Sequence, residues 1–326
     1  MLMTKNILIT RKISNIAVFM LAEKGYVVDV SQKDKILTQQ EIINLLNKKS
    51  YDAVITLLTD NINKTIFETA PTVKIFANYA SGYNNVDITE AKMRGVTVTN
   101  APTSLSAEAV AQHTIAFIFA LATKIVEADK FVRQGKYEGW APMHFLGTNL
   151  FGKTLGLVGA GRIGERVAYF CKGLGLKVIY TDIAKNEKIE KEYGAVYYNS
   201  LDELLSEADF VSLHVPLLPS TKHLINEKNL YLMKPTSFLI NTARGPIIDE
   251  QALEKALRKK IIAGAGLDVF EFEPKVLSGL VELSNVVLTP HIASANADAR
   301  EAMAKTVATD IIDFFEGKVP KNIVNK

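Results

Sequence analysis

Short apolar segments and amphipathic segments alternate along nearly the whole chain. In roughly the first 100 residues, runs rich in β-branched side chains cover 6–10, 26–30, 52–58, 73–78 and 96–100. Near-continuous apolar runs of this length are typical of parallel strands that are buried on both faces. One intervening segment has Asp87 and Glu90 at its start and Gly95 at its end, which indicates a capped helix. The pattern predicts a complete small α/β unit.

A second series of the same kind follows. Strands are predicted at "TLGLVG", "KVIYTD", "AVYY", "ADFVSLHVP", "SFLINTA", "IIAGAGLDVF" and "NVVLTP". Because strands that alternate with helices form doubly wound parallel sheets, we expect an α/β protein with two such domains. A further helix is expected from Ser294 nearly to the end of the chain.

One long helix is expected between the two series, from about Leu105 to Arg133. It would extend about 40 Å, which is more than one face of a domain needs. Its apolar middle, "TIAFIFALA", should be buried but is too short to cross a bilayer. We expect the helix to bridge two domains or to pack against a second subunit, and we predict a homodimer. His113 on this helix is expected to be a packed polar residue rather than a ligand.

Composition narrows the functional classes. A chain of 326 residues with 48% hydrophobic content favours two globular domains with real cores. The net charge of +3 gives no electrostatic reason to expect nucleic acid or a membrane as a partner. The single cysteine, Cys171, excludes an internal disulfide and is expected to be a buried thiol. The chain enters β-type sequence directly, so we expect no signal peptide and a cytoplasmic protein.

The first chemical motif is a glycine turn in the second series. Gly159, Gly161 and Gly164 follow the strand "TLGLV" and precede a helical segment, which is the context that dinucleotide binding requires. The first glycine allows the tight turn, the second lets the pyrophosphate approach the backbone, and the third lets helix and strand pack closely. Asp182 ends the next strand, where a carboxylate accepts hydrogen bonds from the adenosine ribose and repels a 2′-phosphate. We therefore predict NAD as the cofactor, with NADP possible because Lys185 lies nearby.

The remaining chemistry comes late in the chain. Arg244, Glu273 and His291 each follow a predicted strand, and ligands of open parallel sheets bind at the carboxyl ends of the strands. A protonated imidazole can give its proton to the oxygen of a carbonyl that is being reduced, and a neighbouring carboxylate favours the charged ring. A guanidinium fork holds a substrate carboxylate at two points. The three side chains predict a catalytic site for a 2-oxo acid, and no histidine or cysteine cluster suggests a catalytic metal.

These motifs resemble those of the D-isomer-specific 2-hydroxyacid dehydrogenases, most closely the glyoxylate/hydroxypyruvate reductase branch. The resemblance covers almost the whole chain and rests on "NYASGYNNVD", "GLVGAGRIGERVA", "HVPLLPSTKHLIN", "NTARG", "GLDVFEFEP" and "PH". The spacing from Arg244 to Glu273 to His291, 29 and then 18 residues, is also that of the family. Ser81 departs from the branch, which often has an apolar residue there, so a more polar pocket wall is expected.

The resemblance implies roles for further residues. Asp268 would hold the nicotinamide carboxamide, and the amides of Ser81 and Gly82 would grip the substrate carboxylate, with Leu58 also in contact with substrate. Arg244 and His291 would contact both ligands. Further cofactor contacts are implied at Arg162, Ile163, His214, Val215, Pro216, Thr242 and Ala243.

The resemblance also implies how the domains are assembled. Residues 1–101 and 293–326 would form a flavodoxin-like substrate domain, and residues 102–292 a Rossmann nucleotide domain inserted into it. The segment "GWAPMHFLG" resembles a loop that reaches a neighbouring subunit's active site, although Trp140 is equally compatible with ordinary packing.

Several functions are compatible with these residues. Reduction of glyoxylate or hydroxypyruvate with NADH is the leading hypothesis, and D-lactate dehydrogenase or 3-phosphoglycerate dehydrogenase is an alternative within the enzymes. "NYASGYNNVD" offers no basic residues for a phosphorylated substrate. A non-catalytic, dinucleotide-sensing corepressor is the alternative from another class, because such relatives keep the three site residues. The sequence determines neither the physiological substrate nor the direction of the reaction.

Overall fold

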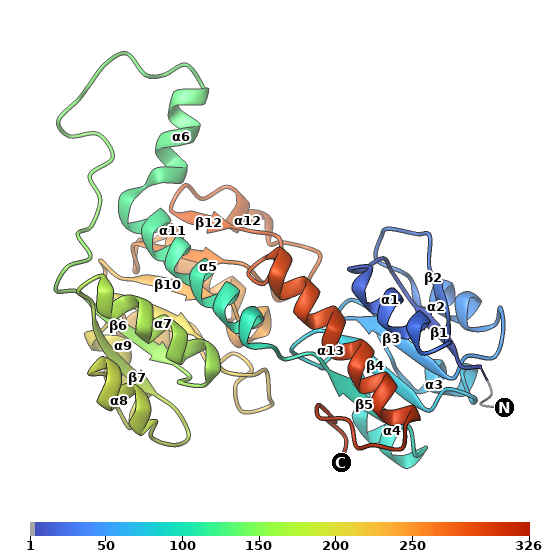
Figure 1. The fold of residues 1–326 in the computed structure, drawn as a ribbon. Coiled ribbons are helices and arrows are strands. Elements are labelled where there is room, and N and C mark those ends of the chain that lie inside the picture. Colours follow the sequence, from blue (N-terminus) through green and yellow to red (C-terminus); the bar gives the residue numbers. More distant parts are fainter. Residues whose placement is uncertain (1–3) are drawn as a thin grey trace. The chain divides into compact units, whose positions relative to one another are not determined.

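The computed structural model describes residues 4–326, and the chain divides into two compact units (Figure 1). One contains the residues up to Ser106 together with Ala295–Lys326, and we call it the discontinuous unit. The other contains Ala107–Ser294, and we call it the inserted unit.

The discontinuous unit is built on a parallel sheet in the order β2-β1-β3-β4-β5. This is the flavodoxin-like strand order, and the five predicted strands are confirmed. The strands are β1 (Asn6–Ile9), β2 (Val27–Val30), β3 (Ala53–Leu57), β4 (Ile75–Tyr79) and β5 (Thr97–Asn100). The helices are α1 (Ile16–Glu23), α2 (Gln39–Leu46), α3 (Lys64–Thr69), α4 (Ile88–Met93) and α13 (Ala297–Phe315).

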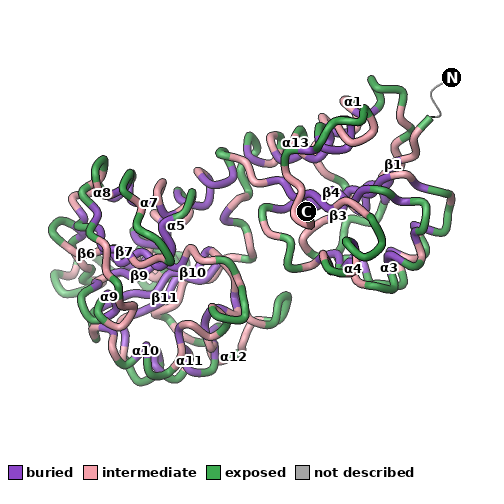
Figure 2. Tube along the Cα trace, turned by 90° about the horizontal axis from the view of Figure 1, so that it is seen from below, coloured by how far each residue is buried: buried purple, intermediate pink, exposed green. Residues whose placement is uncertain are grey.

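Helices cover both faces of this sheet, whose strands are largely buried (Figure 2). On one face α1 and α13 pack side chains such as Leu21, Val307 and Ile311 against the strands. On the other face α2, α3 and α4 provide Ile42, Ile66 and other apolar residues. Helix α4 is capped as predicted, because the amide of Glu90 donates to the side chain of Asp87. The C-terminal helix α13 thus completes a core that the first part of the chain begins.

The inserted unit is built on a seven-stranded parallel sheet in the order β12-β11-β10-β9-β6-β7-β8. The order reverses beside β6, as in Rossmann folds, and the seven predicted strands are confirmed. The strands are β6 (Thr154–Val158), β7 (Lys177–Thr181), β8 (Val196–Tyr197), β9 (Phe210–Leu213), β10 (Phe238–Asn241), β11 (Gly264–Leu267) and β12 (Val286–Leu288). The helices are α6 (Ile125–Arg133), α7 (Arg162–Gly173), α8 (Glu187–Tyr193), α9 (Leu201–Glu207), α10 (Glu227–Leu232), α11 (Glu250–Arg258) and α12 (Ser278–Val281), with a short 3₁₀ helix at Gly245–Ile247.

Helix α5 (Ser104–Thr123) begins in the discontinuous unit and continues in the inserted unit, where α7 and α8 join it on one face of the sheet. The opposite face is covered by α9, α10, α11 and α12. A Cβ at Gly266 would lie 2.8 Å from the ring of Phe117, so a glycine in β11 lets α5 pack directly on the strand. Cys171 is buried in this core, as predicted, and burial raises the pKa of its thiol to about 12.

The prediction of one long helix at 105–133 was wrong. Lys124 has a φ of 56°, and this left-handed residue ends α5 and begins α6. The apolar middle lies in α5 and is buried as expected, with Ile118 and Leu121 in the core. By contrast α6 has no buried residue, and it and the following loop stand away from the sheet of the inserted unit (Figure 1).

Helix α5 is longer than the apolar stretch that the sequence suggested. By length and composition alone its 20 residues could cross a membrane. More than half of its most apolar window is buried inside the protein, which is also the property of a core helix. Its contacts with β11 and α7 account for that apolar character.

Candidate active site

The predicted cofactor and catalytic residues gather at one edge of the inserted unit's sheet. All its strands are parallel, so their carboxyl ends lie along the same edge. The glycine turn follows β6, His214 follows β9, Arg244 follows β10, Asp268 follows β11 and the turn with His291 follows β12. The topology therefore brings together residues that lie up to 132 positions apart, from Gly159 to His291, as open α/β sheets do at their ligand sites.

The glycine turn has the geometry that a bound diphosphate requires. Gly159 has a φ of +99°, and a Cβ there would lie 2.8 Å from the backbone of His214. A Cβ at Gly164 would collide with the carbonyl oxygen of Gly159, whereas a Cβ at Gly161 would meet open space. The amides of Arg162 and Ile163 open helix α7, whose N-cap has no side-chain hydrogen bond. An open concave backbone at a helix N-terminus fits an anionic dinucleotide.

Asp182 is tied to this turn in a way that the sequence did not indicate. One carboxylate oxygen accepts a hydrogen bond from the amide of Ala160 at 2.7 Å, and the other accepts one from the amide of Ile183 at 2.6 Å. Asn186, which sequence reasoning missed, donates to the carbonyl of Ala160 at 2.7 Å. Since each carboxylate oxygen has a further lone pair, Asp182 can still accept from a ribose hydroxyl.

Glu273 and His291 form the pair that their positions beyond predicted strands suggested. Nδ1 of His291 lies 2.9 Å from Oε2 of Glu273, and the second carboxylate oxygen accepts from the amide of Phe270 at 3.1 Å. Burial would raise the pKa of Glu273, but the hydrogen bond from His291, its charge, and the charge of Arg244 together bring that pKa below its ordinary value. Because Nδ1 donates to the carboxylate, Nε2 is the ring atom left for proton exchange.

Arg244 lies beside this pair. Burial lowers the pKa of its guanidinium, and the carboxylate of Glu273 opposes that effect. Nη1 donates to the carbonyl of Ala243 at 2.6 Å, and the side chain of Asn241 donates to the backbone carbonyl of Arg244 at 2.8 Å. A Cβ at Gly245 would collide with the backbone of Phe270, so the two loops that carry Arg244 and Glu273 meet backbone to backbone. Asn241 and Gly245 were missed because their contribution depends on contacts between strands.

Asp268 accepts hydrogen bonds from the turn that contains His291. Its side chain is fully buried and accepts hydrogen bonds from Thr289 and from the amides of Ile292 and Ala293, while its backbone carbonyl accepts from the amide of His291. These bonds hold the turn in which His291 adopts a φ of 55°. His113 lies 3.0 Å from the hydroxyl of Thr289 and packs edge-on against Phe117, in agreement with the prediction of a packed polar residue.

The other residues implied as cofactor contacts surround this edge. Nε2 of His214 lies 2.9 Å from the hydroxyl of Ser212, and burial lowers the pKa of the ring to about 3, so it is neutral. Its Nδ1 is buried without a hydrogen-bond partner among the described residues. The hydroxyl of Thr242 lies 3.1 Å from that of Thr114. Val215 and Pro216 follow His214 beyond the end of β9.

The implied substrate contacts lie at the corresponding edge of the discontinuous unit. Leu58 follows β3, and Ser81 and Gly82 follow β4. Asn100 donates to the carbonyl of Ser81 at 2.6 Å, and Asn78 donates to that of Gly82 at 3.0 Å. Among residues 4–326, no group accepts a hydrogen bond from the amides of Ser81, Gly82 or Tyr83. The loop therefore presents unused backbone donors, which suit a carboxylate.

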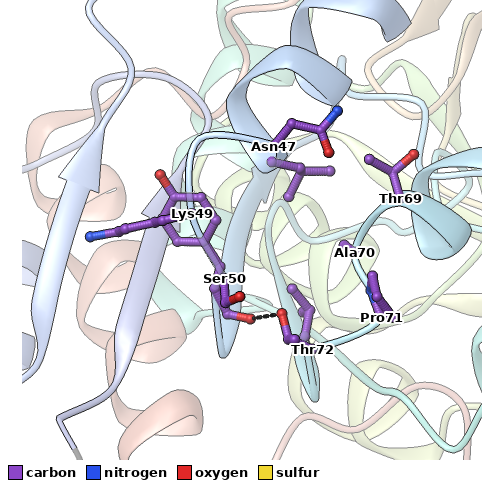
Figure 3. Close-up of a pocket in the computed structure, with 10 residues that line it drawn as sticks. Asn47, Lys49, Ser50, Thr69, Ala70, Pro71 and Thr72 are labelled. Carbon is purple, nitrogen blue, oxygen red and sulfur yellow. Dashed lines mark hydrogen bonds between the residues drawn. The ribbon is translucent and has the colours of Figure 1, made fainter.

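A cavity of about 320 Å³ lies elsewhere on the discontinuous unit (Figure 3). It is lined by the end of α2 and by the turns that precede β3 and β4, where Thr72 donates to the carbonyl of Tyr51. These are the amino ends of the strands. The cavity is thus separate from the strand ends that carry Leu58, Ser81 and Gly82.

Comparisons with known proteins agree with this geometry. The family described as "D-isomer specific 2-hydroxyacid dehydrogenase, NAD binding domain" matches residues 115–293. The glyoxylate reductase of Thermococcus litoralis is 47% identical, over 99% of this chain and 98% of that protein. Among solved structures, the TT0316 protein of Thermus thermophilus has a TM-score of 0.91 at 38% identity, covering 98% of this chain and 99% of that one.

The name of a third relative states its cofactor, NADPH. The NADPH-dependent glyoxylate/hydroxypyruvate reductase of Sinorhizobium meliloti, solved with citrate, has a TM-score of 0.84 at 30% identity and covers 98% of this chain and 97% of that one. Identity, coverage and the Rossmann order of the inserted sheet all lead to one assignment. This chain belongs to the D-isomer-specific 2-hydroxyacid dehydrogenases, which are NAD(P)-dependent oxidoreductases.

Proposed function

We propose that this protein reduces glyoxylate or hydroxypyruvate to the corresponding 2-hydroxy acid, with NADH as the reductant. The observation that carries the proposal is the His291–Glu273 pair beside Arg244. It provides a proton donor and a carboxylate-binding cation at the edge where the glycine turn suits a dinucleotide. The similarity to glyoxylate reductases over nearly the full length supports the choice of substrate.

The geometry supports the following catalytic roles. When bound, the cofactor supplies the hydride that the carbonyl carbon accepts. Arg244 holds the carboxylate of the substrate, and the charged ring of His291 gives its Nε2 proton to the carbonyl oxygen as negative charge develops there. Glu273 keeps the ring oriented and favours its charged form. In the reverse direction the neutral ring accepts the hydroxyl proton.

We also propose that residues 1–101 and 293–326, most of which lie in the discontinuous unit, form the substrate domain and that residues 102–292 form the nucleotide domain. The unused amides of Ser81 and Gly82 would bind the substrate carboxylate, and Leu58 would contact the rest of the substrate. Asp268 would hold the nicotinamide carboxamide in addition to the turn of His291. His214, which is neutral and has a ring nitrogen without a hydrogen-bond partner among the described residues, would face the nicotinamide ring.

A panel of substrates tests the function. Oxidation of NADH and of NADPH is followed with glyoxylate, hydroxypyruvate, pyruvate and phosphohydroxypyruvate, and kcat/KM is compared. We expect the highest value with glyoxylate or hydroxypyruvate and NADH. A preference for pyruvate or phosphohydroxypyruvate would assign the chain to one of the other dehydrogenase activities. Binding of NADH without turnover of any 2-oxo acid would favour the corepressor-like alternative.

We further propose that the protein is a cytoplasmic homodimer formed through α6 and the loop after it. This segment exposes Ile125, Val132, Trp140 and Met143, and Trp140 is 84% exposed. Several exposed large apolar side chains on one segment are typical of a protein–protein interaction site. Light scattering at micromolar concentration should give twice the mass of the chain, and Val132→Glu should give a monomer. A monomeric parent protein would contradict the proposal and Trp140's reach into a neighbouring site.

A further inference from the structure

The loop after β4 is held by two asparagine side chains that form a reciprocal pair. Nδ2 of Asn78 lies 3.0 Å from Oδ1 of Asn85, and Nδ2 of Asn85 lies 3.3 Å from Oδ1 of Asn78. Asn78 is fully buried, and its Oδ1 also accepts from the hydroxyl of Thr56 at 3.0 Å. A pair of amides with one buried member fixes the orientation of both, because breaking the pair leaves the buried group unsatisfied.

The pair connects two loops. Nδ2 of the Asn85 side chain donates to the backbone carbonyls of Leu57 and Asp60, at 3.0 and 2.9 Å, in the turn that follows β3. Nδ2 of the Asn78 side chain donates to the backbone carbonyl of Gly82 in the loop that follows β4. One side-chain pair therefore fixes both the turn that contains Leu58 and the loop that contains Ser81 and Gly82.

The direction of the unused amides follows from this arrangement. In a trans peptide the carbonyl and the next N–H point in opposite directions. Since the carbonyl of Gly82 points at Asn78, the N–H of Tyr83 must point away from that buried residue. The same argument applies to the N–H of Gly82, because Asn100 holds the carbonyl of Ser81. Neither donor is used within the described chain.

We propose that Asn78 and Asn85 are positioning residues for the substrate: they fix the loop that presents the backbone amides at 81–83 to a carboxylate, and they fix the Leu58 turn. Within that loop the pair aims the amide of Tyr83 directly, whereas Asn100 aims the amide of Gly82. The inference rests on the proposed function, because it takes a 2-oxo acid as the ligand. Neither asparagine touches the substrate. The two asparagines affect the free energy with which the substrate carboxylate is bound. The carboxylate is bound in the same way before and during hydride transfer, so this free energy is the same in both states.

The test is Asn85→Ala, with Asn44→Ala on the exposed side of α2 as the matched control. Loss of uniform binding raises KM and leaves kcat unchanged. We expect the KM for glyoxylate to rise roughly tenfold to a hundredfold, as for the loss of a hydrogen bond to a charged group. We also expect kcat within threefold of the parent and an unchanged Kd for NADH, measured by fluorescence. Asn44→Ala should change none of the three.

A KM within threefold of the parent overturns the proposal, and so does a parallel loss of kcat and NADH affinity, which would indicate general damage. If Asn85→Ala does not fold, as judged by thermal unfolding, Asn85→Ser, which keeps a hydroxyl donor, is assessed by the same criteria. The parent protein shows whether the proposed function itself fails. If the parent does not turn over glyoxylate, glyoxylate is not the substrate and the proposed function is wrong. If the parent turns over glyoxylate and Asn85→Ala has the same KM, only the positioning role is wrong.

Discussion

The two strand edges for which we propose catalytic and substrate-binding roles use different chemistry. In the inserted unit the groups are ionisable side chains beyond strand ends. Arg244 donates to the carbonyl of Ala243, Glu273 accepts from the amide of Phe270, and the ring of His291 pairs with Glu273. In the discontinuous unit the groups are backbone amides at 81–83, held from behind by neutral asparagines.

This difference determines how each edge responds to mutation. A catalytic side chain can be removed directly, and its loss is felt in the chemical step. A backbone amide has no side chain to remove, so the edge is weakened only through the residues that orient it. We expect side-chain substitutions to have large effects at the first edge and small effects at the second, apart from the asparagines.

The largest effect is expected for Arg244→Lys. The charge is retained, but the planar fork that binds a carboxylate at two points is lost. We expect a transition-state cost of about 2–4 kcal/mol, or a fall in kcat/KM of roughly 30- to 1,000-fold. Steady-state kinetics with glyoxylate measures it. A value within threefold of the parent would remove Arg244 from the substrate site.

Glu273→Gln should change the pH dependence as well as the rate. The coupling that lowers the pKa of Glu273 is reciprocal, so removal of the carboxylate charge makes the charged ring of His291 less favourable. Reduction needs the charged ring and is lost as pH rises, whereas oxidation needs the neutral ring and is lost as pH falls. Both limbs of kcat/KM should therefore move to lower pH.

Profiles in both directions give the outcome for Glu273→Gln, provided that chemistry limits the rate. Limbs that stay in place while activity falls would mean that the carboxylate only orients the ring. If neither the limbs nor the activity changed, Glu273 would lie outside the site and the mechanism would be wrong.

Asp182→Ala tests the cofactor side of the inserted unit. The substitution removes a ribose acceptor and a charge that repels a 2′-phosphate, and it also frees the amide of Ala160. We expect weaker NADH binding and a shift of the NADH/NADPH preference toward NADPH by roughly tenfold, about 1.4 kcal/mol. The ratio of the two kcat/KM values is the measurement, and an unchanged ratio would leave Asp182 a purely structural role in the turn.

The smallest effect is expected for Ser81→Ala, on the other edge. Ser81 is exposed, and the group assigned to the carboxylate is its backbone amide, which alanine retains. KM and kcat for glyoxylate should both stay within threefold of the parent. A tenfold rise in KM would show that the hydroxyl itself contacts the substrate, and the contrast between the two edges would then be weaker than we infer.

The sequence by itself determined the elements and much of the chemistry. Every predicted strand is present, because near-continuous apolar runs between glycine-rich turns specify buried parallel strands whatever their neighbours are. The glycine turn could be recognised because its requirement, backbone without side chains at fixed offsets, is local. The positions of Arg244, Glu273 and His291 after predicted strands could be interpreted because the carboxyl ends of parallel strands share one edge of the sheet.

Tertiary structure decided what depends on contacts between distant segments. The break at Lys124 is a single left-handed residue in a helical pattern, and no periodicity reveals it. Asn241, Asn186 and Gly245 contribute only through the loops against which they fold, and the Asn78–Asn85 pair joins turns more than 20 residues apart. Hydrophobic periodicity reports which face of an element is buried, whereas the direction of an amide is set by partners that only the folded chain brings within reach.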